Sequence, residues 1–329
     1  MLYPDNRGML EIFRVTFPFF ALVLCGYLAA RLRFLPLEAI PGLNGFVLFF
    51  ALPCMLFRFG ADTPIAQLLD AGVFFTYLFC ALLIVALSIG ISLNRRVRWN
   101  DASLGALVAA FPNTGFMGVP LLVALLGSAA AGPAIVTIVI DMVITTSLCV
   151  ALSRLDGASE QGAAQATKNA LLGMVKNPMP WSILLGTLFS AYQGQLPGPV
   201  DKTVALLADA ASPVALFTIG AVLARSQKIA HHQQHGPLTW HDYVPVALIK
   251  LFLHPVLVLL VGLAAIGMGV PIDVFALKVM VLVAALPSAS NVAMLSERFG
   301  ADSGRIARII LVSTSAAFLT FSAAVALLQ

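Results

Sequence analysis

The chain has 329 residues, of which 60% are hydrophobic and 10% are charged, and its mean hydropathy is +0.96. Because a soluble domain carries about 25% charged residues, this composition excludes a soluble globular protein and predicts an all-α polytopic membrane protein. The net charge of +4 comes from Lys and Arg in a few short loops, so it bears on membrane orientation and contact with lipid and does not indicate nucleic-acid binding.

Ten stretches are apolar enough to cross a bilayer, which takes about 20 residues. The first has no small-residue cleavage site after a short apolar core, so we interpret it as a retained helix and not as a signal peptide. The ten stretches lie at 11–32, 38–58, 70–94, 102–126, 132–154, 168–193, 200–225, 243–267, 274–298 and 303–328.

Most of the 19 Lys and Arg residues fall in loops on one side of this predicted topology. Positively charged loops stay in the cytoplasm, so the sequence predicts a multi-pass protein of the bacterial inner membrane with both termini outside. The clearest members of the cytoplasmic set are Arg31, Arg33, Arg95, Arg96 and Arg98.

A polar segment at 156–167 divides the ten spans into two sets of five. We interpret residues 1–155 and 168–329 as two five-helix repeats and residues 156–167 as a short cytoplasmic linker. Because five is odd, a second half with the same fold enters the membrane from the opposite face, which is the inverted repeat of many secondary transporters.

The fourth and ninth spans contain matching breaks. The sequence LVAAFP at 107–112 recurs as LVAALP at 282–287, 175 positions later. Proline removes a backbone donor and disturbs the preceding turn, and in hydrocarbon the freed carbonyl groups need another partner. Matched breaks at Pro112 and Pro287, one in each half of the chain, therefore predict two broken helices and a transport site at the breaks.

Several motifs carry a resemblance to a known family. They are LNGFV at 43–47 with ALP at 51–53, FPNTGFMGVPL at 111–121, KNP at 176–178, SASNV at 288–292 and ERFG at 297–300. The chain resembles the auxin efflux carrier family, which includes plant PIN proteins and bacterial malonate and malate carriers. The resemblance implies an elevator-like carrier in which the fourth and ninth helices unwind and cross near the midplane. Its scaffold is formed by helices one, two, six and seven, and a homodimer through that scaffold is a further expectation. Asn44 and Pro53, in the second-span motif, are expected to support the site.

The residues at the two breaks suit a carboxylate. Two glycines between two prolines at 112–120 allow the backbone to leave helical geometry, and the amides where helix resumes favour an anion. Neutral side chains would orient the ligand without a permanent salt bridge. The alternative is a Pro-kinked helix whose Asn and Ser side chains cap their own backbone. The predicted substrate-binding residues are Asn113, Thr114, Gly115, Ser288, Ser290 and Asn291.

Asp141 lies inside the fifth span, where an aspartate costs about 2.5–3.5 kcal/mol on insertion scales. It is the candidate for coupling transport to H⁺ or Na⁺, and the alternative is an aspartate that only accepts hydrogen bonds from the unwound segment. Lys250 and His254 lie four residues apart on one face of the eighth span. They are placed to reach Asp141 or the substrate, unless Lys250 extends to the headgroups.

The sequence contains no nucleotide-binding loop and no catalytic set of Ser, His and Asp, so we expect neither an enzyme nor a cofactor or metal centre. The predicted function is secondary transport of a small organic anion, such as malonate, malate or an auxin-like acid. The alternatives are a carrier like the bile-acid sodium symporters, and a membrane sensor or channel. The expected partners are the organic anion and membrane lipid, without nucleic acid.

Overall fold

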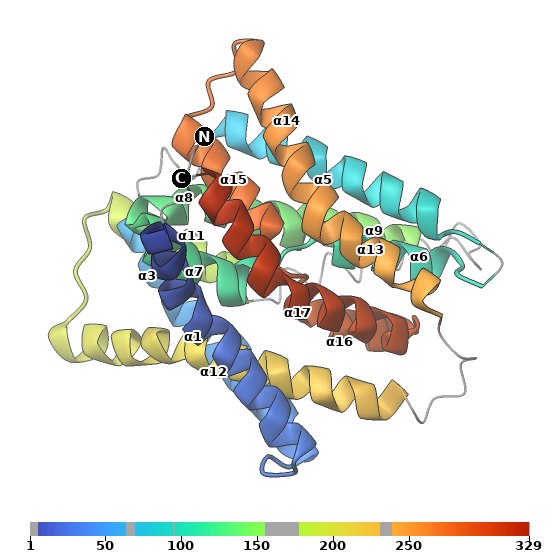
Figure 1. The fold of residues 1–329 in the computed structure, drawn as a ribbon. Helices are drawn as coiled ribbons and strands as arrows, with labels where there is room; N and C mark the ends of the chain where they lie inside the picture. Colours follow the sequence, from blue (N-terminus) through green and yellow to red (C-terminus); the bar gives the residue numbers. More distant parts are fainter. Residues whose placement is uncertain (1–5, 64–69, 95, 155–177, 231–238, 329) are drawn as a thin grey trace. The chain divides into compact units, whose positions relative to one another are not determined.

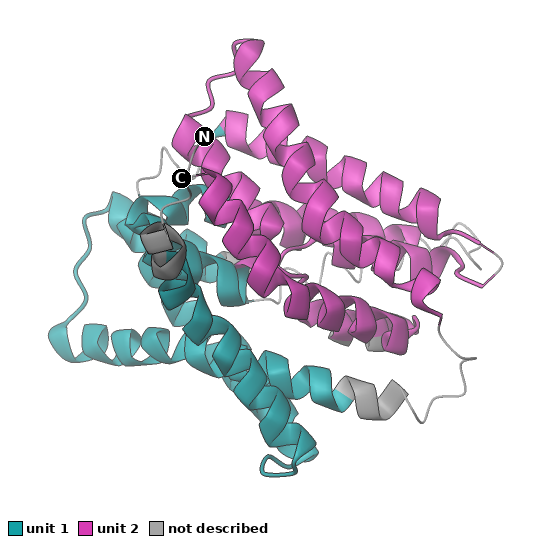
Figure 2. Ribbon diagram, in the orientation of Figure 1, with its two compact units in different colours: residues 1–70, 115–136, 175–225 teal, residues 71–114, 137–174, 226–329 magenta. Residues whose placement is uncertain are grey.

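The computed structural model describes residues 6–63, 70–94, 96–154, 178–230 and 239–328. All regular elements in these ranges are helices, and their order along the chain can be followed in Figure 1. The chain forms two compact units, which Figure 2 colours separately. Unit 1 comprises residues 1–70, 115–136 and 175–225, and unit 2 comprises residues 71–114, 137–174 and 226–329.

Unit 1 is built mainly from long helices at the beginning and in the middle of the chain. A π-helical turn, η2 (Val47–Ala51), continues α2 into α3. Arg58 of α3 lies 3.8 Å from Asp209 of α12, and both side chains are largely exposed. The main helices of this unit are α1 (Asn6–Arg31), α2 (Ile40–Phe46), α3 (Leu52–Asp62), α7 (Val119–Leu126), α11 (Pro178–Ala191) and α12 (Gly198–Ala230), the last as far as residue 225.

Two helix crossings in unit 1 depend on glycine. A side chain at Gly26 of α1 would collide with the Phe217 carbonyl of α12, and one at Gly220 would collide with the Val23 carbonyl of α1. The crossing of α3 and α11 uses Gly60 and Gly186 in the same reciprocal manner. Small residues let membrane helices approach closely. Gly186 follows Gly26 by 160 positions, and Gly220 follows Gly60 by the same interval.

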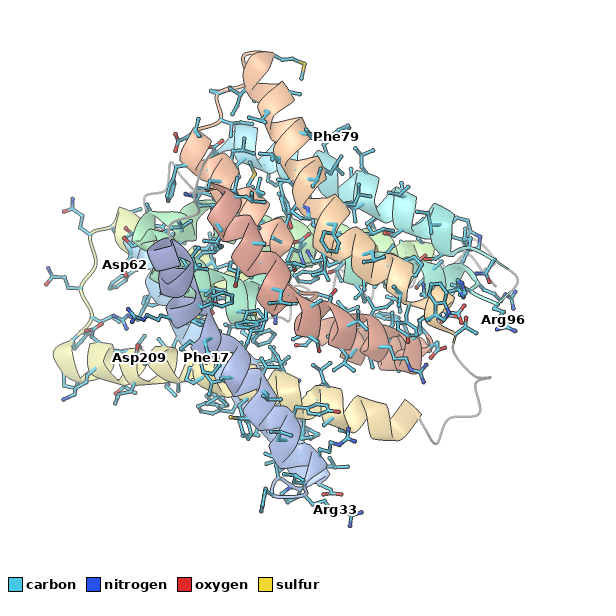
Figure 3. The ribbon with its side chains drawn as sticks, in the orientation of Figure 1. Phe17, Arg33, Asp62, Phe79, Arg96 and Asp209 are labelled. Atoms are coloured by element: carbon cyan, nitrogen blue, oxygen red, sulfur yellow. The ribbon has the colours of Figure 1, made fainter. Side chains whose placement is uncertain are left out.

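Unit 2 contains two short helices that are buried almost throughout, α6 (Trp99–Ala110) and α15 (Val274–Ala285). A helix that is apolar on all sides belongs to the protein interior. On α5, by contrast, Phe75 and Phe79 are exposed (Figure 3 labels Phe79), as expected of a face toward lipid. The other main elements of this unit are α5 (Ala71–Ser92), η5 (Ile140–Thr145), α9 (Thr146–Leu152), η6 (Trp240–Asp242), α13 (Val244–Leu248), η7 (Ile249–Leu253), α14 (His254–Gly267), α16 (Asn291–Phe299) and α17 (Ser303–Leu328).

In the described part of the chain, seven helices are long and apolar enough to cross a membrane. Three shorter apolar helices, Thr114–Leu126, Trp181–Ala191 and Val274–Ala285, fall within three more of the ten predicted stretches. Two of these are short because the predicted fourth and ninth spans are interrupted after α6 and α15. The ten-span, two-repeat arrangement stays a prediction, and the predicted linker at 156–167 lies outside the described residues.

Candidate functional site

The two broken segments pair with each other in unit 2. After α6 and α15 end, Pro112 and Ser288 form an isolated antiparallel bridge. The Asn113 amide donates to the Pro287 carbonyl at 2.8 Å, and the Ala289 amide donates to the Phe111 carbonyl at 2.9 Å. Buried backbone groups need such partners, so each break satisfies part of the backbone of the other.

An asparagine stands beside each break with an unused side-chain oxygen. Asn113 is 3% exposed, and its Oδ1 atom is buried without a hydrogen-bond partner among the described residues. Asn291, the first residue of α16, also has a buried Oδ1 atom without a hydrogen-bond partner among the described residues. A buried polar group without a partner is costly, and the two carboxamides are therefore candidates for contact with a ligand.

The start of α16 adds backbone donors to Asn291. The amides in the first turn of a helix have no partner four residues earlier within that helix. In α16, the Val292 and Ala293 amides make long hydrogen bonds of 3.4 and 3.2 Å to the Ala289 and Ser290 carbonyls. This end of the helix also carries the positive end of its dipole, which favours an anion.

The other predicted binding residues have different environments. Ser288 donates its amide to Ser313 Oγ at 3.3 Å, and the two hydroxyl oxygens are 3.1 Å apart, so Ser288 is bonded to α17. Ser290 is buried, and Thr114 is fully buried with its amide bonded to the Pro112 carbonyl at 2.8 Å. Gly115 belongs to unit 1 and has no atom within 4 Å of the position a Cβ would take.

Lys250 and His254 are completely buried in unit 2. Lys250 Nζ donates to the Ala284 carbonyl at 2.8 Å and lies 3.2 Å from His254 Nδ1. An ammonium group only donates, so Nδ1 accepts and the neutral ring carries its proton on Nε2. The ring faces the Ala109 carbonyl, although Nε2 makes no hydrogen bond of ordinary geometry.

Ala109 and Ala284 are the matching residues of the two breaks, 175 positions apart. In an uninterrupted helix their carbonyls would accept from the amides four residues later. Those amides, of Asn113 and Ser288, donate elsewhere. Lys250 therefore lies against the carboxyl-terminal end of α15, and the His254 ring faces the carboxyl-terminal end of α6. Both helix ends carry the negative end of a helix dipole.

Asp141 lies on the π-helical turn η5 and is also completely buried. Tyr77 of α5 donates to its Oδ2 at 2.9 Å, and Thr145 donates to its Oδ1 at 3.2 Å. The Asp141 and Lys250 charges are close enough to interact. The Tyr77 ring lies 6.0 Å from that of His254. Asp141 and Lys250 both lie on π-helical turns, which are frequent at functional sites.

Asn44 and Pro53 lie in unit 1, on α2 and α3, on either side of η2. The sequence interpretation missed three buried partners in unit 2: Tyr77, Thr145 and Ser313. A tyrosine within an otherwise apolar span was an available signal for Tyr77. Single Ser and Thr residues are common in membrane helices because they can bond their own backbone, so the other two carried no distinctive pattern.

We expect Lys250→Met to lower the stability of the protein strongly. It removes the donor to the buried Ala284 carbonyl and to His254 Nδ1, and each buried polar group left without a partner costs about 1–3 kcal/mol. The free energy of unfolding is measured by SDS titration in mixed micelles. Lys278→Met, at a partly exposed lysine of α15, is the control and should change it by about 0.5 kcal/mol or less. Equal losses in both variants would contradict this role of Lys250.

Comparison with known proteins identifies the family of this chain. The family described as membrane transport protein matches residues 12–325. A "Putative malonate transporter" of Rhizobium meliloti (strain 1021) is 31% identical over 307 residues, covering 93% of this chain and 92% of the relative. The "Uncharacterized transporter YfdV" of Escherichia coli (strain K12) is 27% identical over 295 residues and 86% of each chain. The chain therefore belongs to the membrane transport protein family, which is the auxin efflux carrier family.

Proposed function

We propose that the protein is a secondary active carrier of a small organic anion, with a carboxylate or dicarboxylate of malonate or malate size as substrate. The observation that carries the proposal is the pairing of two helix breaks in unit 2 with a buried, unpartnered asparagine oxygen beside each. A carboxamide can turn to present either its N–H groups or its oxygen. Together with the first amides of α16, the two side chains form a donor set for a carboxylate.

The substrate class rests on the relative whose name includes malonate and on the charges near the breaks. Among the described side chains of this cluster, Lys250 is already bonded to Ala284 and His254 and faces Asp141. Donors at the site are therefore mainly neutral amides and carboxamides. Such a set binds an anion strongly enough to select it and weakly enough to release it, as a carrier requires.

We also propose that Asp141 couples transport to H⁺ or Na⁺. Intramembrane carboxylates commonly belong to proton or ion pathways, and Asp141 is completely buried between Tyr77 and Thr145. Protonation of the carboxyl group, or a sodium ion beside it, would change the charge next to Lys250. That change would reach the helix end that Lys250 holds at Ala284.

The proposed mechanism is elevator-like, with two inverted repeats and with unit 2 carrying the anion as one body. The equal interval of 160 positions between the two pairs of crossing glycines in unit 1 supports the repeat, as does the interval of 175 positions between the breaks. We further propose that the protein forms a homodimer through scaffold helices α1, α3, α11 and α12.

Transport by purified protein in proteoliposomes tests the proposal. Uptake of radiolabelled malonate, malate and indole-3-acetate is measured with no gradient, with a proton gradient and with a sodium gradient. We expect saturable uptake of at least one carboxylate, raised by one gradient. Ionic currents far above carrier turnover would instead indicate a channel, and absence of uptake and of counterflow for every acid would overturn the substrate class.

We propose that the protein lies in the bacterial inner membrane with both termini outside, because the loop around Arg96 belongs to the basic set. A cysteine introduced at Arg96 in a cysteine-free background should resist a membrane-impermeant maleimide in intact spheroplasts and react after lysis. A cysteine introduced at Tyr192, an exposed residue after α11, should react before lysis. The reverse pattern would invert the orientation.

A further inference from the structure

A buried arginine joins the ends of four elements in unit 2. Arg305, in the first turn of α17, is 2% exposed. Its Nε donates to the Asp242 carbonyl at 2.7 Å, its Nη1 to the Asp101 carbonyl of α6 at 2.8 Å, and its Nη2 to Ser92 Oγ of α5 at 3.1 Å. A planar guanidinium presents its donors in a fixed fork, so these three bonds set the ends of the elements relative to one another.

The surrounding residues are arranged to receive this guanidinium. A Cβ atom at Gly105 of α6 would lie 2.5 Å from Arg305 Nη1, so glycine at that position leaves the space that the guanidinium occupies. The Asp302 side chain accepts from the Arg305 amide at 2.9 Å, and the Asp302 amide donates to Asp101 Oδ1 at 2.7 Å. The beginning of α17 is thus bonded to the beginning of α6 through backbone and side chain.

Acidic groups balance the charge of Arg305. The carboxylates of Asp101, Asp302 and Asp242 are all close enough to interact with it. Burial acts to raise the pKa of Asp242, but hydrogen bonds from Thr239 and the charges of Arg96 and Arg305 hold that pKa below its usual value. Asp242 therefore stays ionised, with its side chain bonded to Thr239 and its carbonyl to Arg305.

The same helix α17 also holds the second break. Ser313, eight residues after Arg305, accepts the Ser288 amide, and eight residues of helix span about 12 Å. The other anchored helix, α6, has 12 residues, or about 18 Å, and leads directly to Pro112 and Asn113. Helix α17 is thus bonded to the start of α6 through Arg305 and to the second break through Ser313. The second break in turn pairs with the segment that follows α6.

We propose that Arg305 is a positioning residue that, through Gly105 and α6, sets the place of the first break relative to the second. The binding consequence rests on the proposed function, because it assumes that Asn113 contacts the transported anion. The positioning itself does not depend on any substrate.

Gly105→Ala is the main test because it removes no polar group and acts only by crowding the guanidinium. Gly90→Ala in α5 is the matched control, since no atom lies within 4 Å of its Cβ position. Arg305→Lys keeps the charge and loses the fork. Hydrogen–deuterium exchange is followed in peptides covering residues 104–116, alongside calorimetric binding of malonate well below the thermal midpoint.

We expect Gly105→Ala and Arg305→Lys to raise deuterium uptake across residues 106–114 and to weaken malonate binding about three- to tenfold, with Gly90→Ala like wild type. In the Arg305→Lys background, Gly105→Ala should add little, because the crowded group is gone. Faster exchange confined to residues 101–105 would overturn the positioning role. So would a double variant whose loss of malonate affinity equals the product of the losses in Gly105→Ala and Arg305→Lys. Faster exchange across 106–114 in a protein that binds none of the acids would uphold the positioning role and contradict only the proposed function.

Discussion

Asn113→Ala and Asn291→Ala are each expected to weaken carboxylate binding by roughly one to two decades. Each side chain would supply a hydrogen bond to a charged ligand, worth about 1.5–3 kcal/mol, and about 1.4 kcal/mol corresponds to a tenfold change in affinity. Because both Oδ1 atoms are buried without a partner in the described part of the protein, removal of either side chain should not lower the thermal midpoint. Calorimetric titration with malonate and a thermal melt measure the two quantities.

Asn94→Ala is the matched control, because Asn94 accepts from the Arg96 and Val97 amides in a loop after α5. It should leave malonate affinity unchanged. Unchanged affinity in both Asn113→Ala and Asn291→Ala would place the anion site away from the breaks and leave the paired segments as packing features.

Substitution of Pro112 or Pro287 by alanine should act differently. Alanine restores a backbone donor and favours helix, so helix can extend through the break and compete with the bonds of Asn113 to Pro287 and Ala289 to Phe111. We expect loss of binding together with a changed thermal midpoint, in contrast to the asparagine variants.

Asp141→Asn is expected to abolish concentrative uptake while counterflow exchange of substrate continues. Exchange needs no net movement of the coupling ion, whereas accumulation does. Asparagine keeps the shape of the side chain and can still accept a hydrogen bond from Tyr77 or Thr145, so the fold should persist. Uptake into proteoliposomes under an imposed ion gradient and exchange between labelled and unlabelled substrate measure the two activities.

Asp209→Asn is the control for Asp141→Asn, because Asp209 lies in unit 1 and its side chain is 77% exposed beside Arg58. Both activities should remain near wild type in that variant. Gradient-driven accumulation at the wild-type level in Asp141→Asn would assign Asp141 a structural role only. Loss of both accumulation and exchange would also contradict a coupling role, because it would show that the carboxylate is needed for substrate movement itself.

Family membership and the helical breaks could be predicted from the sequence because their causes are local. A composition of 60% hydrophobic residues leaves only a membrane as solvent, and proline disfavours the continuation of a helix, although α1 and α12 continue through Pro18 and Pro213. The repetition of LVAAFP and LVAALP indicated that two breaks belong together. Asp141, Lys250 and His254 also stood out, since charged or polar groups are rare within apolar spans.

The partners of these residues were decided by tertiary structure. No local pattern indicates that Lys250 bonds Ala284, that Tyr77 bonds Asp141, or that the Ser288 amide turns to Ser313, because each bond joins segments 25 to 64 residues apart in the chain. Arg305 shows the difference most clearly. By sequence it is one of several basic residues near a helix end, whereas the fold buries it among the ends of α5, α6 and α17. Composition and proline act within a few residues of chain, while the satisfaction of buried polar groups depends on which helices pack together.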